Sequence, residues 1–146
     1  ENYFMKVLVL NGPNLGRLDL RDNSIYGKLD FEGLKKFIEE AAKSLGLEVD
    51  IRQTDSEVEM INWLHEAAEK NLPVVINPAA FTHYSYAIRD AADMVKSPLI
   101  EVHLSNPLSR EEFRHTSVIS GVANGTIGGF GPDSYRLALT ALANMK

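Results

Sequence analysis

Two residues whose side chains could take part in acid–base chemistry, an arginine and a tyrosine, share one polar segment of the chain. Arg21 and Tyr26 lie between Gly16 and Gly27, a length and boundary typical of functional loops. A tyrosine titrates at about pH 10, so it serves as a base at neutral pH only if its phenolate is stabilised by roughly 3 to 4 kcal/mol. A guanidinium stays charged and can supply that stabilisation, and both Arg17 and Arg21 are candidates. The segment indicates a tyrosine base activated by an arginine on a lid, although its composition alone favours a plain exposed loop.

A carboxylate and an imidazole form a second pair. Glu101 and His103 are two positions apart in an apolar run, so on a strand they point to the same face of the sheet. The carboxylate can orient the imidazole and raise its pKa, which favours a protonated histidine able to donate to a leaving hydroxyl. Taken alone, the pair favours a structural ion pair, and only its position beside the other polar clusters of the chain favours a functional role. His83 is weaker, because a histidine after Thr82 in a loop is as often a structural hydrogen-bonding group.

Apolar runs alternate along the chain with helical patterns, which is typical of βα units and a parallel sheet. The expected strands cover residues 6–10, 47–53, 73–77 and 98–104, with a fifth within 121–128. The first expected helix is capped by Asp30, and the second opens at the capping box of Ser56 and Glu59. The third covers 84–95, the fourth opens at Ser109 with Glu112, and the fifth starts at Pro132. We therefore predict an α/β fold, a flavodoxin-like doubly wound five-stranded parallel sheet with strand order 2-1-3-4-5.

Polar residues follow the carboxyl ends of three of these strands. They are Asn11, Asn14, Arg17, Arg21 and Tyr26 after the first strand, Asn77, Thr82 and His83 after the third, and His103, Ser105 and Asn106 after the fourth. In the order 2-1-3-4-5 these strands are neighbours at the point where the winding direction switches. The sequence therefore predicts that the three clusters converge in one pocket.

The composition narrows the class of protein. The chain has 146 residues, 45% of them hydrophobic and 24% charged, which suits one compact domain with a proper core. With a net charge of -5 and no run of Lys or Arg, it gives no indication of nucleic acid or an anionic membrane as a partner. There is no cysteine, and no apolar stretch approaches the length of a membrane span, so we expect a soluble cytoplasmic protein.

We expect residues 5–146 to form a single catalytic domain that begins at an initiator Met5. Residues 1–4 read as the remnant of an expression tag. No lysine is placed at the predicted pocket, which disfavours a Schiff base. His83, Glu101 and His103 lack tight metal-ligand spacing, so we expect neither a metal site nor another cofactor.

Longer motifs add a family resemblance that spans residues 5–146. They are Leu10-Asn-Gly-Pro-Asn-Leu-Gly-Arg17, Arg21 with Tyr26-Gly27, Asn77-Pro78 with Thr82-His83, Arg89-Asp90, Ile100-Glu-Val-His-Leu-Ser-Asn106, Arg110-Glu-Glu-Phe-Arg114 and Gly128-Gly-Phe-Gly131. This set closely resembles the type II 3-dehydroquinate dehydratases. The resemblance implies elimination of water from 3-dehydroquinate to give 3-dehydroshikimate through an enolate, a step of the shikimate pathway or of quinate breakdown.

The resemblance also implies catalytic roles. Tyr26 would remove a proton next to the ketone, Arg21 would keep Tyr26 ionised, and Asn14 would hold the water that stabilises the enolate oxygen. His103, oriented by Glu101, would protonate the departing C1 hydroxyl.

Substrate-binding roles follow from the same resemblance. The backbone N–H groups of Leu104 and Ser105 would bind the substrate carboxylate, as exposed amides at a strand end can. Asn77, His83 and Arg114 would grip substrate hydroxyls.

The resemblance further implies a homododecamer built as a tetramer of trimers, in which Asp90 would belong to the pocket of a neighbouring subunit. Some positions depart from the usual family pattern. Arg21-Asp22-Asn23 stands where Arg-Glu-Pro is common, and Ala79, Phe81 and Tyr84 replace a frequent Gly, Tyr or Leu, and Thr. These departures bear on the rigidity of the lid and the shape of the pocket, since loss of a proline frees the backbone.

Two alternatives remain open at this stage. A flavodoxin-like module that binds FMN or a phosphate would carry a loop rich in Gly, Ser and Thr after the first strand. Residues 11–16 have no hydroxyl and include Pro13, and the turn 128–131 is only a fragment of a dinucleotide fingerprint. The other alternative is a family member that has lost activity and serves as an assembly scaffold. The intact set of predicted catalytic residues argues against it.

Overall fold

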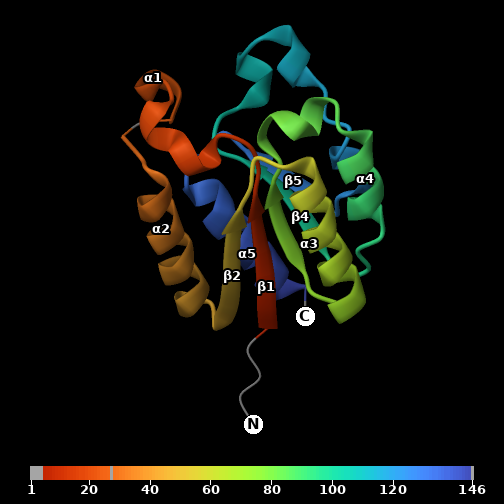
Figure 1. Ribbon diagram of the computed structural model, residues 1–146. Coiled ribbons are helices and arrows are strands. Elements are labelled where there is room, and N and C mark those ends of the chain that lie inside the picture. The colour runs from red at the N-terminus through yellow and green to blue at the C-terminus, as the bar shows by residue number, and fades with distance from the viewer. Residues whose placement is uncertain (1–4, 27, 146) are drawn as a thin grey trace.

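The computed structural model describes residues 5–26 and 28–145, apart from the side chain of Tyr26 (Figure 1). Its centre is a five-stranded sheet in the order β2-β1-β3-β4-β5. Every neighbouring pair of strands is parallel. The strands are β1 (Met5–Asn11), β2 (Leu47–Gln53), β3 (Val74–Asn77), β4 (Leu99–His103) and β5 (Gly125–Gly128). The predicted doubly wound order is confirmed.

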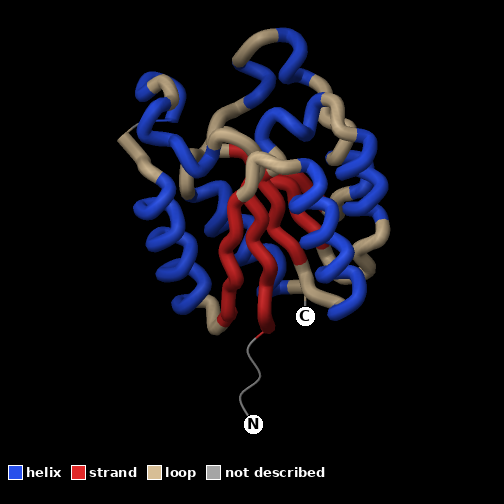
Figure 2. Tube along the Cα trace, in the orientation of Figure 1, coloured by secondary structure: helices blue, strands red, loops and turns tan. Residues whose placement is uncertain are grey.

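Helices cover both faces of the sheet, which gives three layers (Figure 2). The long helices are α2 (Phe31–Ser44), α3 (Glu57–Lys70), α4 (Tyr86–Asp93) and α5 (Asp133–Asn144). One face is covered by α2 and α5, and the other by α3 and α4. None of the helices formed by residues 5–26 and 28–145 is both long and apolar enough to cross a membrane.

The interior strand β1 lies between β2 and β3, and its packing explains why its sequence is apolar without interruption. Val7 and Val9 pack into the core on the α2 and α5 side, whereas Leu8 and Leu10 pack into the core on the α3 and α4 side. All four side chains are fully buried. A strand covered on both faces reads as a continuous hydrophobic run, because successive side chains alternate between two buried faces.

The predicted helix starts are confirmed at two caps. The Asp30 carboxylate accepts from the Gly33 N–H at 2.7 Å, and the Ser56 hydroxyl accepts from the Glu59 N–H at 3.3 Å. Each side chain satisfies an N–H that the first helical turn leaves without a partner. The third helix, α4, starts later than predicted, because Ser85 caps it after a 3-10 turn, η2 (Ala79–His83).

The prediction of a helix that opens at Ser109 is wrong. Two short 3-10 turns occupy this region, η3 (Pro107–Ser109) and η4 (Glu112–His115). The Ser109 hydroxyl donates to the Asn106 carbonyl at 2.8 Å, so it is engaged by the preceding turn. It therefore does not cap a helix through Glu112.

We call residues 15–26 the lid segment, and it is folded. It contains a 3-10 helix, η1 (Leu15–Leu20), and a one-turn helix, α1 (Asn23–Tyr26). Leu15 and Leu18 are buried in the core on the α2 side. These two leucines anchor the segment, so the plain exposed loop that composition favoured is not what forms.

The start of β1 and the end of α5 lie at one end of the sheet, and the lid segment and the turns after β4 lie at the other (Figure 1). The strands are parallel, so their carboxyl ends all point toward the lid segment. Loops at this end are where open α/β sheets bind ligands.

Candidate active site

A cavity of about 100 Å³ lies where the carboxyl ends of β1, β3 and β4 meet, and we call it the site cavity. Loops that are far apart in the sequence supply its wall. The lining residues are Pro13, Asn14, Leu15, Arg21, Asn77, Ala79, Ala80, His83, His103, Leu104, Ser105, Pro107, Arg110 and Arg114. The structure thus brings most of the predicted site residues together, at the edge that the strand order indicated.

The loop after β1 and the lid segment bring Asn14 and Arg21 to the cavity. Asn14 has a φ of 70°, a left-handed conformation that asparagine tolerates better than most residues, and its N–H donates to the Asp55 carboxylate at 2.8 Å. Arg17, the alternative partner for the tyrosine, does not line the cavity. Its guanidinium instead makes two bonds of 3.0 Å to the exposed carboxylate of Asp19.

The end of β4 carries the predicted carboxylate and imidazole on one face. Nε2 of His103 lies 2.5 Å from Oε2 of Glu101. The Glu101 side chain is 1% exposed and that of His103 is 15% exposed. The carboxylate therefore lies behind the imidazole, and the imidazole faces the site cavity.

Hydroxyl groups surround the Glu101 carboxylate. Ser120 donates to Oε1 at 2.6 Å, Thr82 donates to Oε2 at 2.6 Å, and Ser117 lies 3.1 Å from both oxygens. Burial by itself raises the pKa of Glu101, but the hydrogen bond and charge of His103 and the bonds from Ser120 and Thr82 outweigh burial. The net pKa of Glu101 is below its usual value, so this carboxylate stays ionised beside the imidazole.

Sequence reasoning missed Ser117 and Ser120. They lie 16 and 19 positions from Glu101, in a segment without a recognisable pattern, and only the tertiary fold brings them to the carboxylate. It also missed Arg110, whose guanidinium is 14% exposed, lines the cavity and donates to the Ser105 hydroxyl at 3.2 Å. The spacing of Arg110 within the same motif as Arg114 was the available signal.

Asn77 is the last residue of β3, and its side chain is almost completely buried. Its Oδ1 accepts from the Ala79 N–H at 3.1 Å, and its Nδ2 donates to the Tyr135 hydroxyl at 2.8 Å. The amide is therefore held from both sides while it lines the cavity.

His83 and Arg114 both line the cavity, and both contact the ring of Phe113. The His83 ring meets Phe113 edge-on, with centroids 5.9 Å apart, and its Nδ1 lies 2.8 Å from the Thr116 carbonyl. The Arg114 guanidinium lies 4.6 Å from the centroid of the same ring, and its Nε donates to Glu111 at 3.2 Å. Both side chains are thus positioned by contacts to residues that do not line the cavity.

The remaining predicted residues differ in their placement. Leu104 and Ser105 follow β4 and line the cavity, where the Leu104 carbonyl accepts from the Gly131 N–H at 2.9 Å. Asp90 is exposed on α4 and does not line the cavity of this chain. Tyr26 ends α1, but its side chain lies outside the described part of the structure.

A second cavity, of about 390 Å³, lies on the Glu101 side of the imidazole. Thr82, Ser117 and Ser120 line it, and it shares His103 and Arg114 with the site cavity. Within the residues that the structure describes, no three His, Cys, Asp or Glu side chains are grouped closely enough to hold a metal ion.

The sequence model of the family described as Dehydroquinase class II matches residues 5–143. The chain belongs to this family. A relative in the family is the 3-dehydroquinate dehydratase of Salinispora tropica, 56% identical over 139 residues, which are 95% of this chain and 97% of that protein. The counterpart from Kineococcus radiotolerans is 50% identical over 139 residues, or 95% of each chain.

Solved class II dehydroquinases have the same fold as this chain. The type II dehydroquinase from Propionibacterium acnes superposes with a TM-score of 0.93 and 51% identity, over 97% of this chain and 99% of that one. The type II dehydroquinase from Butyrivibrio crossotus gives a TM-score of 0.92 and 47% identity, over 95% and 97%. The similarity covers nearly the whole chain.

One departure from the usual pattern of class II dehydroquinases has a visible effect on the backbone. Ala79, which replaces the glycine that the family resemblance leads us to expect, has a φ of 50°. This left-handed conformation costs a residue with a Cβ about 1 to 2 kcal/mol relative to the right-handed one. The wall of the site cavity therefore contains a strained turn.

Proposed function

We propose that this chain eliminates water from 3-dehydroquinate to give 3-dehydroshikimate through an enolate. The single observation that carries the proposal is the buried Glu101 carboxylate 2.5 Å behind the His103 imidazole, at the wall of a cavity that Arg21 and Asn14 also line. Relatives that align along the full domain are named 3-dehydroquinate dehydratase, which supports the same substrate.

Proton removal is assigned to Tyr26. Its phenolate takes the proton from the carbon next to the ketone, and the electron pair moves into the enolate. The Arg21 guanidinium lines the cavity from the lid segment, where its charge favours the ionised phenol. Asn14 holds a water that donates to the enolate oxygen, which lowers the energy of the intermediate.

Proton donation is assigned to His103. Because its Nε2 is bonded to Glu101, Nδ1 is the nitrogen left to meet the leaving group. The enolate re-forms its ketone as its electron pair makes the C1–C2 double bond, and the bond from C1 to oxygen breaks. The His103 proton goes to that oxygen, which leaves as water. The ionised Glu101 carboxylate is hydrogen-bonded to the imidazole and fixes its orientation.

Substrate binding is assigned to groups on the other loops. The Leu104 and Ser105 N–H groups take the carboxylate, as exposed amides at a strand end can. Asn77, His83 and Arg114 take the hydroxyls, and all three line the cavity. These contacts hold C1 and C2 between the acid and the base, which converts binding into correct geometry.

A direct assay tests the reaction. The chain is mixed with 3-dehydroquinate, and the ultraviolet absorbance of the conjugated product is followed. Tyr26→Phe should lower kcat by roughly 10²- to 10⁴-fold with little change in KM, because general base catalysis is worth that much. Val58→Ala is the control, since Val58 is exposed on α3 and lines neither cavity, and it should keep full activity.

Three outcomes would remove parts of the mechanism. A Tyr26→Phe variant with normal turnover would show that another group is the base. His103→Ala should also lose turnover, and a fast variant would remove His103 as the acid. Borohydride added with substrate should leave the enzyme active, and trapping of substrate on a lysine would contradict an imine-free route.

Assembly and location belong to the same proposal. We take the chain to form a homododecamer built as a tetramer of trimers, in which the exposed Asp90 of α4 reaches a neighbouring subunit's pocket. Its expected cytoplasmic location also stays a prediction. The mass of the particle in light scattering tests the assembly, and a monomer with full activity would contradict the role of Asp90.

A further inference from the structure

We propose that Tyr135 is a positioning residue for the site cavity, through Asn77. Its buried hydroxyl fixes which way the Asn77 amide faces and holds the turn that follows β3. The inference rests on the proposed function in one respect, that Asn77 binds a substrate hydroxyl. No pattern in the sequence distinguishes this tyrosine from an ordinary core residue of a helix.

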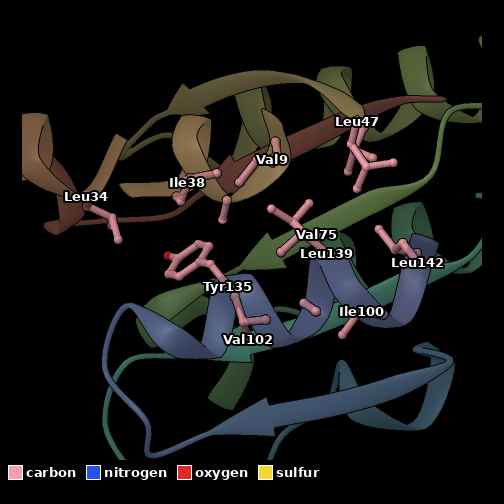
Figure 3. Packing of buried hydrophobic residues seen from close by; sticks show 14 of the residues in the cluster. Val9, Leu34, Ile38, Leu47, Val75, Ile100, Val102, Tyr135, Leu139 and Leu142 are labelled. Carbon is pink, nitrogen blue, oxygen red and sulfur yellow. The ribbon is translucent and has the colours of Figure 1, made fainter. Parts of the chain in front are cut away.

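Tyr135 connects three elements through one hydroxyl group. It lies in the first turn of α5, is fully buried, and projects from the helix into the space beside the sheet (Figure 3). The hydroxyl donates to Oδ1 of Asn11 at 2.6 Å and accepts from Nδ2 of Asn77 at 2.8 Å. Asn11 ends β1 and Asn77 ends β3, so the hydroxyl bridges the ends of two neighbouring strands.

The donor and the acceptor of each of these hydrogen bonds are fixed by the groups at the two ends of the network. Asn11 Nδ2 lies 3.1 Å from the Arg52 carbonyl, which can only accept, so Asn11 must present its oxygen to Tyr135. The Tyr135 hydrogen is then used on Asn11, and its lone pair must accept from Asn77. The Asn77 oxygen is left to accept from the Ala79 N–H at 3.1 Å.

The charge state of the hydroxyl supports this assignment. Burial raises the pKa of Tyr135 above its ordinary value, so the group is neutral and always has one hydrogen to donate. Tyr135 does not line the site cavity, so we assign its hydroxyl an orienting role.

The far end of this chain of bonds is in the site cavity. Asn77, Ala79 and Ala80 all line it, and Ala79 is the residue held at a φ of 50°. With its orientation fixed, the Asn77 amide keeps one N–H and one lone pair for a ligand. Without Tyr135 the Asn77 amide could flip, which would exchange the positions of its oxygen and nitrogen. The strained turn would then lose the hydrogen bond from the Ala79 N–H to the Asn77 oxygen.

Tyr135→Phe tests the inference, because it keeps the ring and removes only the oxygen. We expect KM for 3-dehydroquinate to rise about tenfold, the order expected for one oriented hydrogen bond, with kcat changed less than about threefold. Leu142→Ala is the matched control, since Leu142 is buried in the same core from the same helix. It should lower the unfolding temperature and leave KM unchanged.

A double variant separates positioning from stability. If Tyr135 acts through Asn77, Tyr135→Phe should raise KM no further when Asn77→Ser is already present. Independent, multiplying effects would overturn the inference, as would a Tyr135→Phe variant that loses stability while KM stays normal. Should Tyr135→Phe not fold, Asn11→Ser breaks the same chain one link earlier and carries the test with the same expected rise in KM.

The failure of the proposed function has a different signature. A wild-type protein that does not turn over 3-dehydroquinate would refute the function and leave Tyr135 to be tested by NMR. The side-chain NH₂ signals of Asn77 should exchange slowly with solvent in the wild type and quickly in Tyr135→Phe. Equal exchange in both proteins would overturn the positioning role.

Discussion

Backbone strain at single residues is concentrated at the wall of the site cavity. Asn14 and Ala79 both line the cavity and both have left-handed φ values, 70° and 50°. Asparagine tolerates this conformation because its side chain can bond locally, whereas alanine gains no compensation. The Asn77 carboxamide and the close packing of Pro78 hold Ala79 in place. Strain of this kind persists where the surrounding structure over-determines the turn.

Ala79→Gly should stabilise the protein. Glycine adopts the left-handed conformation without strain, and the gain exceeds its larger loss of chain entropy, so we expect the unfolding free energy to rise by about 0.5 to 1 kcal/mol. Denaturant unfolding measures the change. Ala80→Gly, next in the chain and without a positive φ, is the control and should lose stability. Equal losses in both variants would show that Ala79 carries no strain.

Some contacts between single residues could be predicted from the sequence, and others could not. The two-residue spacing of Glu101 and His103 was sufficient to predict that they share a face, because strand geometry alone decides it. The serines around Glu101 and the bond from Tyr135 to Asn77 could not be predicted. They join positions whose separation along the chain carries no periodic signal.

At the scale of elements, the loops after β1 and β3 approach so closely that a side chain does not fit between them. The Gly12 N–H donates to the Asn77 carbonyl at 2.8 Å. A Cβ on Gly12 would lie 2.5 Å from the Pro78 carbonyl oxygen and 2.8 Å from its carbon. These atoms belong to the backbone and cannot rotate away, so the two loops that form one wall of the cavity are locked together.

Gly12→Ala should therefore lower the unfolding free energy by roughly 1 to 3 kcal/mol, the usual cost of forcing atoms into a packed site. It should also reduce turnover, because Pro13 and Asn14 would move. Gly125→Ala on the edge strand is the control, since nothing lies within 4 Å of its added Cβ. Thermal unfolding and the absorbance assay measure both effects. Similar behaviour of the two variants would contradict the close approach as the cause.

Elements were predictable wherever periodicity and caps agreed. The strands and the helices capped by Asp30 and Ser56 follow the sequence patterns closely. Two segments did not follow their sequence patterns: the one from Ser109 to His115 and the lid segment. Their short 3-10 turns depend on side chains of neighbouring turns and on two buried leucines, and no helical period of apolar residues precedes them.

One carboxylate, that of Glu66, makes the unfolding free energy of the whole molecule depend on pH. The Arg52 guanidinium contacts Glu66 at 2.9 Å and Asp50 at 2.8 Å, and it lies 5.6 Å from the centroid of the Trp63 ring. The bonds from Arg52 lower the pKa of Glu66 from 4.5 to about 2. A lowered carboxylate pKa stabilises the fold fully above pH 4.5, and that contribution disappears as the pH falls toward about 2.

Arg52→Met should therefore lose stability at neutral pH and little at low pH. We expect the unfolding free energy to fall by about 1 kcal/mol at pH 7, since the pair is partly open to solvent. The difference from the wild type should shrink between pH 4.5 and about 2, where Glu66 takes up its proton. Arg136→Met, in an exposed pair with Asp133, is the control and should change little. A difference independent of pH would show that lost packing is the cause.

Topology decided the location of the site before any side chain was placed. Strand order alone brings the ends of β1, β3 and β4 together, so a rule about connections could predict one pocket at one edge. The dodecamer and the contribution of Asp90 stay predictions, because the contacts that would carry them lie between copies of the chain. The chemistry of each loop follows from its own residues, whereas its convergence with other loops follows from the fold.

The opposite orientation of the chain ends and the site cavity has a practical consequence. β1 starts, and α5 finishes, at the end of the sheet farthest from the cavity (Figure 1). A linker that replaces the residues before Met5 or after Met145 would therefore begin at the end of the sheet away from the site cavity. The single chain can thus be tethered to a support without obstructing substrate entry.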